Sequence, residues 1–333
     1  MNQTPTASPP ASAQSIRIAP ERLSFLQDAV ATGAALSAAE KLGVLARLDR
    51  GPATPAEVAA DCAISQRGAE LLLAALAGLG LLEAGAGGAY TATLPGLVRI
   101  GALRAPWDHL TTAIQLDRPA VSGDTLSGAA AYYPKATPFL GAVMTPVAHK
   151  AAEIIVQGRA GLRVLDIGAG AATWSLPIAA RDSASRITAL DVAEVLPVTQ
   201  RSVAAVGLQD RFEYVGGDLF SIDLTPSTYD VVIAGNVCHL FDVDTNRRLL
   251  RRAYEALKPG GQLAILDAVP TDQMDGPRQV VLYALGLLWR TSHGRVYPFS
   301  TYNAWLQEIG FTTTERVDLA ADPAVSLILA ARA

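Results

Sequence analysis

The stretch Arg163-Val-Leu-Asp-Ile-Gly-Ala-Gly-Ala-Ala-Thr-Trp-Ser175 decides the fold of this chain. Its first part, residues 164–167, predicts a short and mainly apolar strand. Gly168 and Gly170 then permit a tight turn in which the backbone can approach a ligand closely. Residues 171–180 have the composition of a helix that begins at this turn. A strand, a glycine turn and a helix in this order build a nucleotide-type pocket at the carboxyl end of a parallel strand.

Further strand-like runs follow, and a polar residue stands after each of them. A carboxylate about twenty residues beyond the glycines, here Asp191, can accept hydrogen bonds from both hydroxyls of a ribose. Because the runs alternate with helix-like segments, they predict a parallel, doubly wound α/β sheet with the polar residues at one edge. The runs and the residues after them are 187–190 with Asp191, 212–215 with Asp218 and Leu219, 229–234 with Asn236 and His239, and 262–266 with Asp267.

Taken in order, these residues resemble the motifs of class I S-adenosylmethionine (SAM) methyltransferases, whose domain is a Rossmann-like sheet of seven strands. The motifs are Asp166-x-Gly168-x-Gly170, Asp191, Asp218, the strand with Asp230, and Leu257-Lys-Pro-Gly-Gly261, within residues 157–333. The resemblance implies that Asp191 holds the ribose and that Asp218 and Leu219 flank the adenine. The full set of cofactor-binding residues that it implies is Asp166, Gly168, Gly170, Asp191, Asp218, Leu219 and Asn236.

One position departs from the family pattern, because Ala172 replaces the third glycine of the turn. A nicotinamide-dependent enzyme is the nearest alternative. Its fingerprint requires a glycine where Thr173 stands. SAM is therefore the predicted cofactor.

The composition is typical of a soluble enzyme. The 333 residues allow about two domains, and 50% hydrophobic residues suffice for large cores. A net charge of −4 argues against a nucleic acid or an anionic membrane as partner. Cys62 and Cys238 provide no disulfide framework, which favours a reducing, cytoplasmic location. Residues 1–19 are expected to form a disordered tail.

Residues 20–102 have a winged-helix pattern, in which helices precede a glycine-rich hairpin at 81–94. A DNA-binding regulator is one interpretation of this pattern. The helix in the recognition position, 67–79, has only Arg67 and Glu70 among leucines and alanines, whereas groove reading needs basic and amide side chains. The arrangement resembles the N-terminal dimerisation domain of plant-type O-methyltransferases and their bacterial relatives, which implies a homodimer. The low charged fraction of 17% also favours surfaces buried in an oligomer.

Residues 103–156 are expected to connect the two domains through helices. In the resembling family this stretch covers the active site, so Tyr132, Tyr133 and Met144 are candidate walls for SAM or the substrate. The alternative is an aromatic and methionine stripe that packs the two domains together.

The chemistry is expected beyond the strands 229–234 and 262–266. In the plant-type O-methyltransferases a histidine at the place of His239 is the general base that removes a phenolic proton. A neutral imidazole is suited to this task. In those enzymes a carboxylate orients the base, but its place lies near Val296 here, and His293 appears slightly upstream.

His239, Asp267 and His293 therefore form a predicted catalytic set that can also bind an iron or zinc ion, with Asp242 as the alternative carboxylate ligand. This set resembles that of bacterial 2-oxo-acid C-methyltransferases, in which a metal stabilises the enolate. Metal-assisted methylation of the β-carbon of a 2-oxo acid is the favoured prediction. Either Arg290 or Arg295 can bind the substrate carboxylate.

The alternative reaction is O-methylation of a phenol or enol natural product of secondary metabolism, with His239 as the general base. A SAM-fold binding module or a non-methylating catalyst is the alternative from another class. Formation of S-adenosylhomocysteine with any substrate separates an enzyme from a binding module.

Overall fold

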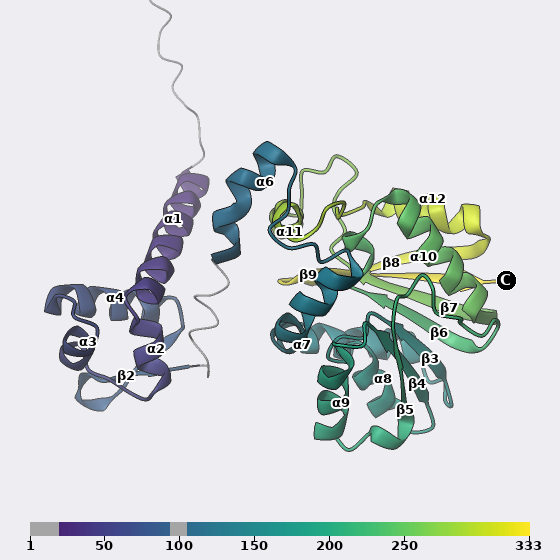
Figure 1. Ribbon diagram of the computed structural model, residues 1–333, viewed down its shortest axis with the longest axis horizontal. Coiled ribbons are helices and arrows are strands. Elements are labelled where there is room, and N and C mark those ends of the chain that lie inside the picture. Colours follow the sequence, from purple (N-terminus) through teal and green to yellow (C-terminus); the bar gives the residue numbers. More distant parts are fainter. Residues whose placement is uncertain (1–19, 94–104) are drawn as a thin grey trace, which may run out of the picture. The chain divides into compact units, whose positions relative to one another are not determined.

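The computed structural model describes residues 20–93 and 105–333, and the chain divides into two compact units between Asp108 and His109. The predicted tail at 1–19 and the predicted boundary at 102/103 lie outside the described residues. Figure 1 labels the elements of each unit and colours them along the sequence.

The N-terminal unit is a small helical domain with a hairpin. Its apolar core gathers side chains from every helix, including Leu45, Val58 and Leu73. Thr54 and Glu57 form a capping box at the start of α3, as their spacing predicts. The elements are α1 (Pro20–Lys41), α2 (Val44–Asp49), α3 (Pro55–Asp61), α4 (Gln66–Gly78), β1 (Leu82–Ala84), η1 (Ala86–Gly88) and β2 (Tyr90–Ala92).

The antiparallel pair of β1 and β2 confirms the predicted hairpin. The sequence predicts two first helices, at residues 21–32 and 34–48, with a division at Gly33. This division is wrong, because α1 continues through Gly33. The break lies at Gly43, whose φ of 75° is in the left-handed region that favours glycine.

The C-terminal unit is built on a seven-stranded sheet in the order β5-β4-β3-β6-β7-β9-β8. The first five of these strands are parallel to their neighbours, and β9 is antiparallel to both β7 and β8. This order places the carboxyl ends of β3, β4, β5, β6 and β7 at one edge, as the sequence predicts. The strands are β3 (Arg163–Ile167), β4 (Arg186–Asp191), β5 (Phe212–Gly216), β6 (Tyr229–Gly235), β7 (Leu257–Asp267), β8 (Phe311–Ala321) and β9 (Ala324–Arg332).

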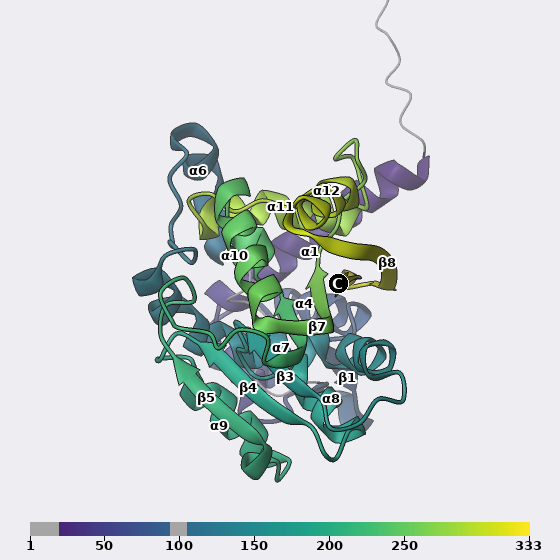
Figure 2. The same ribbon diagram turned by 90° about the vertical axis from the view of Figure 1, so that its right-hand side faces the viewer.

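Helices cover both faces of this sheet (Figures 1 and 2). One apolar cluster joins α7, α8 and α9 to one face, and another joins α10 and α12 to the opposite face. The helical elements are η2 (Ala105–His109), α6 (Leu110–Leu116), α7 (Leu126–Val156), α8 (Ser175–Arg181), α9 (Leu196–Ala205), η3 (Gln209–Arg211), η4 (Cys238–Leu240), α10 (Val243–Ala256), α11 (Arg278–Arg290) and α12 (Phe299–Ile309).

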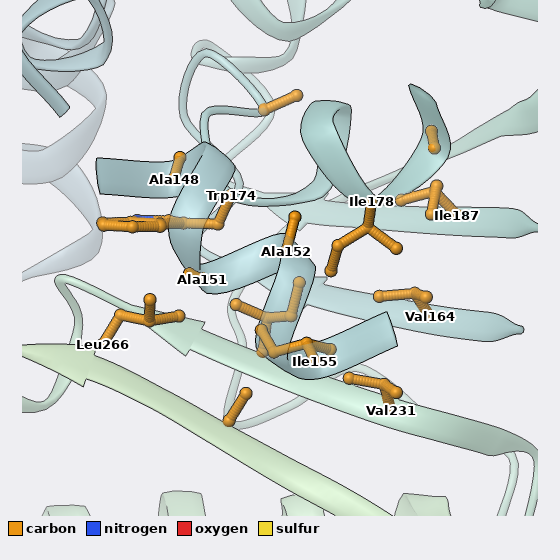
Figure 3. Packing of buried hydrophobic residues seen from close by; sticks show 14 of the residues in the cluster. Ala148, Ala151, Ala152, Ile155, Val164, Trp174, Ile178, Ile187, Val231 and Leu266 are labelled. Carbon is orange, nitrogen blue, oxygen red and sulfur yellow. The ribbon is translucent and has the colours of Figure 1, made fainter. Parts of the chain in front are cut away.

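Helix α7 is long and apolar enough to span a membrane, by length and composition alone. Its C-terminal half packs on the sheet instead, which is the behaviour of a core helix. Figure 3 shows this contact. Its labelled residues are Ala148, Ala151, Ala152 and Ile155 of α7 with Val164, Trp174, Ile178, Ile187, Val231 and Leu266.

Candidate active site

A cavity at the carboxyl edge of the sheet is lined by the glycine turn after β3 and by Tyr283 and Arg290 of α11, among other residues. The turn is built as its sequence predicts. Gly168 and Gly170 have φ values of 67° and 55°, and their positive sign favours glycine. A Cβ on Gly168 would lie 2.6 Å from a methyl group of Val237. The turn therefore needs glycine for both its conformation and its close packing.

Asp191 ends β4 and reaches back to this turn. One carboxylate oxygen accepts a hydrogen bond from the Gly170 amide at 2.8 Å, and the other accepts one from the Val192 amide at 2.7 Å. Burial raises the pKa of Asp191 to about 6, against these hydrogen bonds, which lower it. A half-buried carboxylate that lines a cavity is suited to accept the two hydroxyl groups of a ribose.

The other predicted cofactor residues divide into two groups. Asp218, Leu219 and Asn236 line the same cavity as Asp191 and the glycine turn. Asn236 has a φ of 57°, and its side-chain oxygen accepts a hydrogen bond from the Trp174 indole at 3.2 Å. Asp218, Leu219 and Asn236 thus share one cavity with Asp191 and the glycine turn, and this combination is suited to bind a nucleoside. The site therefore fits SAM.

Asp166 does not belong to the lining of this cavity. It is fully buried, and the Ser175 hydroxyl at the start of α8 donates to it at 2.5 Å. Burial raises its pKa to about 7. Its predicted direct contact with the cofactor is therefore replaced by an indirect role, in which the carboxyl group joins β3 to the helix that follows the turn.

A histidine–aspartate pair lies at the catalytic end of the cavity. His239 in η4 is 3% exposed, and Asp267 at the end of β7 is 0% exposed. His239 Nδ1 lies 2.7 Å from one carboxylate oxygen of Asp267, and the His239 amide donates to the other at 3.1 Å. The carboxylate can only accept, so this contact assigns the proton to Nδ1 and leaves Nε2 as an acceptor.

Tyr283 of α11 occupies the other side of this imidazole. Its hydroxyl lies 2.7 Å from His239 Nε2 and donates to it in this tautomer. Burial raises the pKa of Tyr283, so the phenol is neutral. His239 and Tyr283 both line the cavity. A hydroxyl group is thus already accommodated at the nitrogen that a general base would use.

The predicted metal set does not assemble. His293 is exposed and lies outside the cavity lining, and its amide donates to Asp124 at 3.1 Å. Within residues 20–93 and 105–333, no group of three or more His, Cys, Asp and Glu residues is placed to hold a metal ion. Only His239 and Asp267 of the predicted set come together, and they bond to each other. The predicted convergence of His239, Asp267 and His293 is therefore wrong.

Asp242 does not complete this set either. It caps α10, where one of its carboxylate oxygens accepts the Thr245 amide at 2.8 Å. This hydrogen bond keeps the pKa of Asp242 low. Its carboxylate is used to begin a helix and lies outside the cavity lining.

The expectations for the cavity walls are met in part. Tyr133 and Met144 line the cavity, whereas Tyr132 packs edge-on against Tyr133 with ring centroids 5.2 Å apart. Tyr283 was not predicted, because residues 280–289 have the composition of a core helix. The sequence does contain a signal from which this face of the helix could have been identified, because polar side chains stand at 283 and 290, two helical turns apart in an apolar segment.

Replacing His293 by alanine is expected to leave kcat within about threefold of wild type, because an exposed side chain outside the cavity takes no part in the reaction. The measurements are steady-state kinetics and elemental analysis of the purified variant and wild type. Loss of both turnover and a bound metal in His293→Ala would restore the metal site.

Affinity for SAM is expected to fall below pH 6. The free enzyme protonates Asp191 with a pKa of about 6, and a protonated carboxyl group is a poorer acceptor for ribose hydroxyls. Binding must then release a proton, so the Kd rises about tenfold for each pH unit below this pKa. Calorimetric titration between pH 5 and 8 measures the effect, and a Kd that stays constant across this range would contradict it.

Comparison with known proteins identifies the two parts of the chain. Residues 25–94 match the O-methyltransferase dimerisation domain, and residues 155–312 match the O-methyltransferase domain. Together these matches cover most of the chain. The dimerisation domain supports a homodimer, and α1 exposes the apolar side chains of Leu23, Leu26 and Val30.

Individual relatives differ in the atom that they methylate. The chain is 27% identical over 321 residues to 3-hydroxy-5-methyl-1-naphthoate 3-O-methyltransferase of Streptomyces sahachiroi, covering 90% of this chain and 91% of that protein. It is 31% identical over 162 residues to L-tyrosine C(3)-methyltransferase of Streptomyces lavendulae, covering 47% and 43% of the two chains.

The solved structures that resemble this one include human N-acetylserotonin methyltransferase in complex with SAM, with a TM-score of 0.73. The match covers 96% of this chain and 99% of that one at 24% identity, and it supports the fold. The sheet, the glycine turn with Asp191 and the matches to both domains agree. The chain belongs to the O-methyltransferase family with an N-terminal dimerisation domain, and it is a SAM-dependent methyltransferase.

Proposed function

We propose that this enzyme methylates the hydroxyl oxygen of a small phenol or enol, with His239 as the general base. The observation that carries the proposal is the buried pair of His239 and Asp267, because Asp267 accepts from Nδ1 and leaves Nε2 of this cavity-lining histidine as an acceptor. Bound SAM supplies an electrophilic methyl group on a sulfonium centre. The chain must then bind the acceptor molecule, remove its proton and keep water out.

The pair of residues is suited to the proton transfer. A substrate hydroxyl that replaces the Tyr283 hydroxyl at Nε2 donates its proton there, and its oxygen becomes the nucleophile. Protonation makes the imidazole positive, and the adjacent Asp267 carboxylate at 2.7 Å stabilises this charge. The low exposure of both groups strengthens this interaction by excluding water.

The walls of the cavity favour an aromatic acceptor. Its lining includes Tyr133, Trp174 and Phe241, and aromatic rings pack well against one another in edge-on or offset arrangements. The naphthoate O-methyltransferase to which the chain is similar over most of its length also supports an aromatic hydroxyl as the acceptor. The metal-assisted reaction of a 2-oxo acid, which was favoured from the sequence, lacks an assembled set of ligands among the described residues.

The proposal is tested by identifying the product. Purified enzyme is incubated with SAM and separately with 3-hydroxy-1-naphthoate, 2-naphthol and phenylpyruvate, and S-adenosylhomocysteine is quantified. NMR of the product then distinguishes a methyl ether from a new carbon–carbon bond. A methyl ether from either naphthol supports the proposal. β-Methylated phenylpyruvate that disappears on chelation would contradict it and favour the metal-assisted reaction. Absence of S-adenosylhomocysteine with all three acceptors would count against it.

A further inference from the structure

Arg290 is a half-buried cation in the lining of the cavity. It is the last residue of α11, and it lines the cavity together with Tyr283 and His239. Its Nε and Nη2 atoms are buried, and neither has a hydrogen-bond partner in the part of the chain that the structure describes. A guanidinium group has five N–H donors and remains charged in proteins. Buried donors without partners are rare and call for an explanation.

The residues around Arg290 supply aromatic rings and a side-chain hydrogen bond with Tyr283, but no counter-charge. Its guanidinium carbon lies 4.7 Å from the Tyr283 ring centroid and 5.6 Å from that of Trp289. Burial raises the pKa of both Tyr283 and Tyr133, so these phenols are neutral at physiological pH. Among the described residues, no carboxylate lies within ion-pair distance of Arg290.

The carboxylates that line the cavity accept hydrogen bonds from backbone amides and not from Arg290. Asp191 accepts from the amides at the glycine turn, and Asp218 accepts from the Phe220 amide. One oxygen of Asp124 accepts from the amides of Ser292 and His293. The second oxygen of Asp124 is buried without a partner in the described ranges, so this carboxylate is not engaged with Arg290.

The position of Arg290 is fixed by its backbone. The amide of Gly123 donates to the Arg290 carbonyl at 2.8 Å, and the amides of Ala120 and Val121 donate to the Trp289 carbonyl. The segment before α7 thereby holds the end of α11 against the cavity. Arg295 follows in the next loop but is exposed and does not line the cavity.

We infer that Arg290 binds a carboxylate of the acceptor substrate. A planar guanidinium group matches a carboxylate with two parallel hydrogen bonds, and Nε with one terminal nitrogen forms such a fork. The two unpartnered atoms, Nε and Nη2, are suited to this arrangement. The inference rests on the proposed function and narrows its substrate to a hydroxylated aromatic acid.

Tyr283 contacts both groups of the proposed substrate site. Its hydroxyl lies 2.7 Å from His239 Nε2, and its ring centroid lies 4.7 Å from the Arg290 guanidinium carbon. Because one side chain touches both residues, a single small molecule is suited to carry the hydroxyl for His239 and the carboxylate for Arg290.

The test compares one phenol with and without the carboxylate. The probes are 3-hydroxy-1-naphthoate and 2-naphthol, whose reacting hydroxyl groups stand on the same ring position. Binding to enzyme saturated with S-adenosylhomocysteine is measured by calorimetry, and kcat and KM are measured with SAM. The variants are Arg290→Gln and Arg290→Lys, with the exposed Arg295→Gln as the matched control.

Wild-type enzyme and Arg295→Gln are expected to bind the acid at least about tenfold more tightly than 2-naphthol. Arg290→Gln is expected to remove this preference, because it weakens the binding of the acid and leaves the binding of 2-naphthol unchanged. Arg290→Lys keeps a point charge without the fork, so an intermediate loss is expected, and this variant carries the test if Arg290→Gln does not fold. Wild-type enzyme that binds the acid no better than 2-naphthol overturns the inference.

An unchanged affinity of Arg290→Gln for the acid overturns it as well. Failure of the proposed function gives a different result. In that case the acid binds through Arg290, but neither probe is methylated. This result would support the carboxylate site at Arg290 and contradict the proposed reaction at His239.

Discussion

Replacing His239 by alanine is expected to lower kcat by about 10²- to 10⁴-fold while SAM still binds. The Nε2 atom is the proposed acceptor of the substrate proton, and a methyl side chain offers none. The binding end of the cavity, around Asp191, is built from other strands and is expected to remain intact. Rapid-quench measurement of methyl transfer, with calorimetry of SAM binding, separates the two effects.

Asp267→Asn tests the same assignment without removing the imidazole. An amide at this position can donate its N–H to Nδ1, which favours the tautomer with the proton on Nε2. In that tautomer Nε2 cannot accept the substrate proton. We expect a loss of kcat of about 10²-fold or more.

Tyr283→Phe is the matched control for this pair. It removes the hydroxyl that now donates to Nε2 but leaves His239 and Asp267 in place. If the substrate gives its proton directly to His239, this variant retains kcat within about tenfold. A loss as large as that of His239→Ala would mean that Tyr283 passes the proton on, and direct transfer to His239 would be contradicted.

The nucleotide end of the cavity could be predicted from the sequence because its signals are local. The glycine turn, its strand and Asp191 follow one another in a parallel strand-turn-helix unit, and the carboxyl ends of such strands must meet at one edge. The pairing of Asp166 with Ala189 and of Asp191 with Gly216 confirms this edge. The meeting of His239 with Asp267 follows in the same way, because β6 and β7 are neighbours.

The substrate end could not be predicted in the same way, because it depends on contacts between distant segments. His293 stands close in sequence to the expected ligand position, but Asp124, remote in the chain, binds its backbone amide. The sequence does not reveal this bond, so it does not reveal that the imidazole is exposed. The sequence likewise does not distinguish Arg290 from Arg295 as the residue that binds the substrate carboxylate. Only the packing of α11 against the segment at 120–124 separates them.

The loss of SAM binding in Asp191→Ala is the second large effect that we expect. In the free enzyme this carboxylate accepts the amides of Gly170 and Val192, and its location in the cavity suits two further hydrogen bonds from a ribose. Hydrogen bonds to a charged group contribute about 1.5–3 kcal/mol each. Two of them correspond to a Kd that is about 10²- to 10⁴-fold higher in the variant.

The experiment is a calorimetric titration with SAM and with S-adenosylhomocysteine, since both carry the same ribose. Asp210→Ala is the matched control, because this aspartate is exposed and lies outside the cavity. Circular dichroism of both variants checks that the sheet is retained. Asp191→Asn adds a second reading, since an amide keeps one acceptor oxygen but loses the charge, and its Kd should lie between those of wild type and Asp191→Ala. Wild-type affinity in Asp191→Ala would remove Asp191 from the cofactor site.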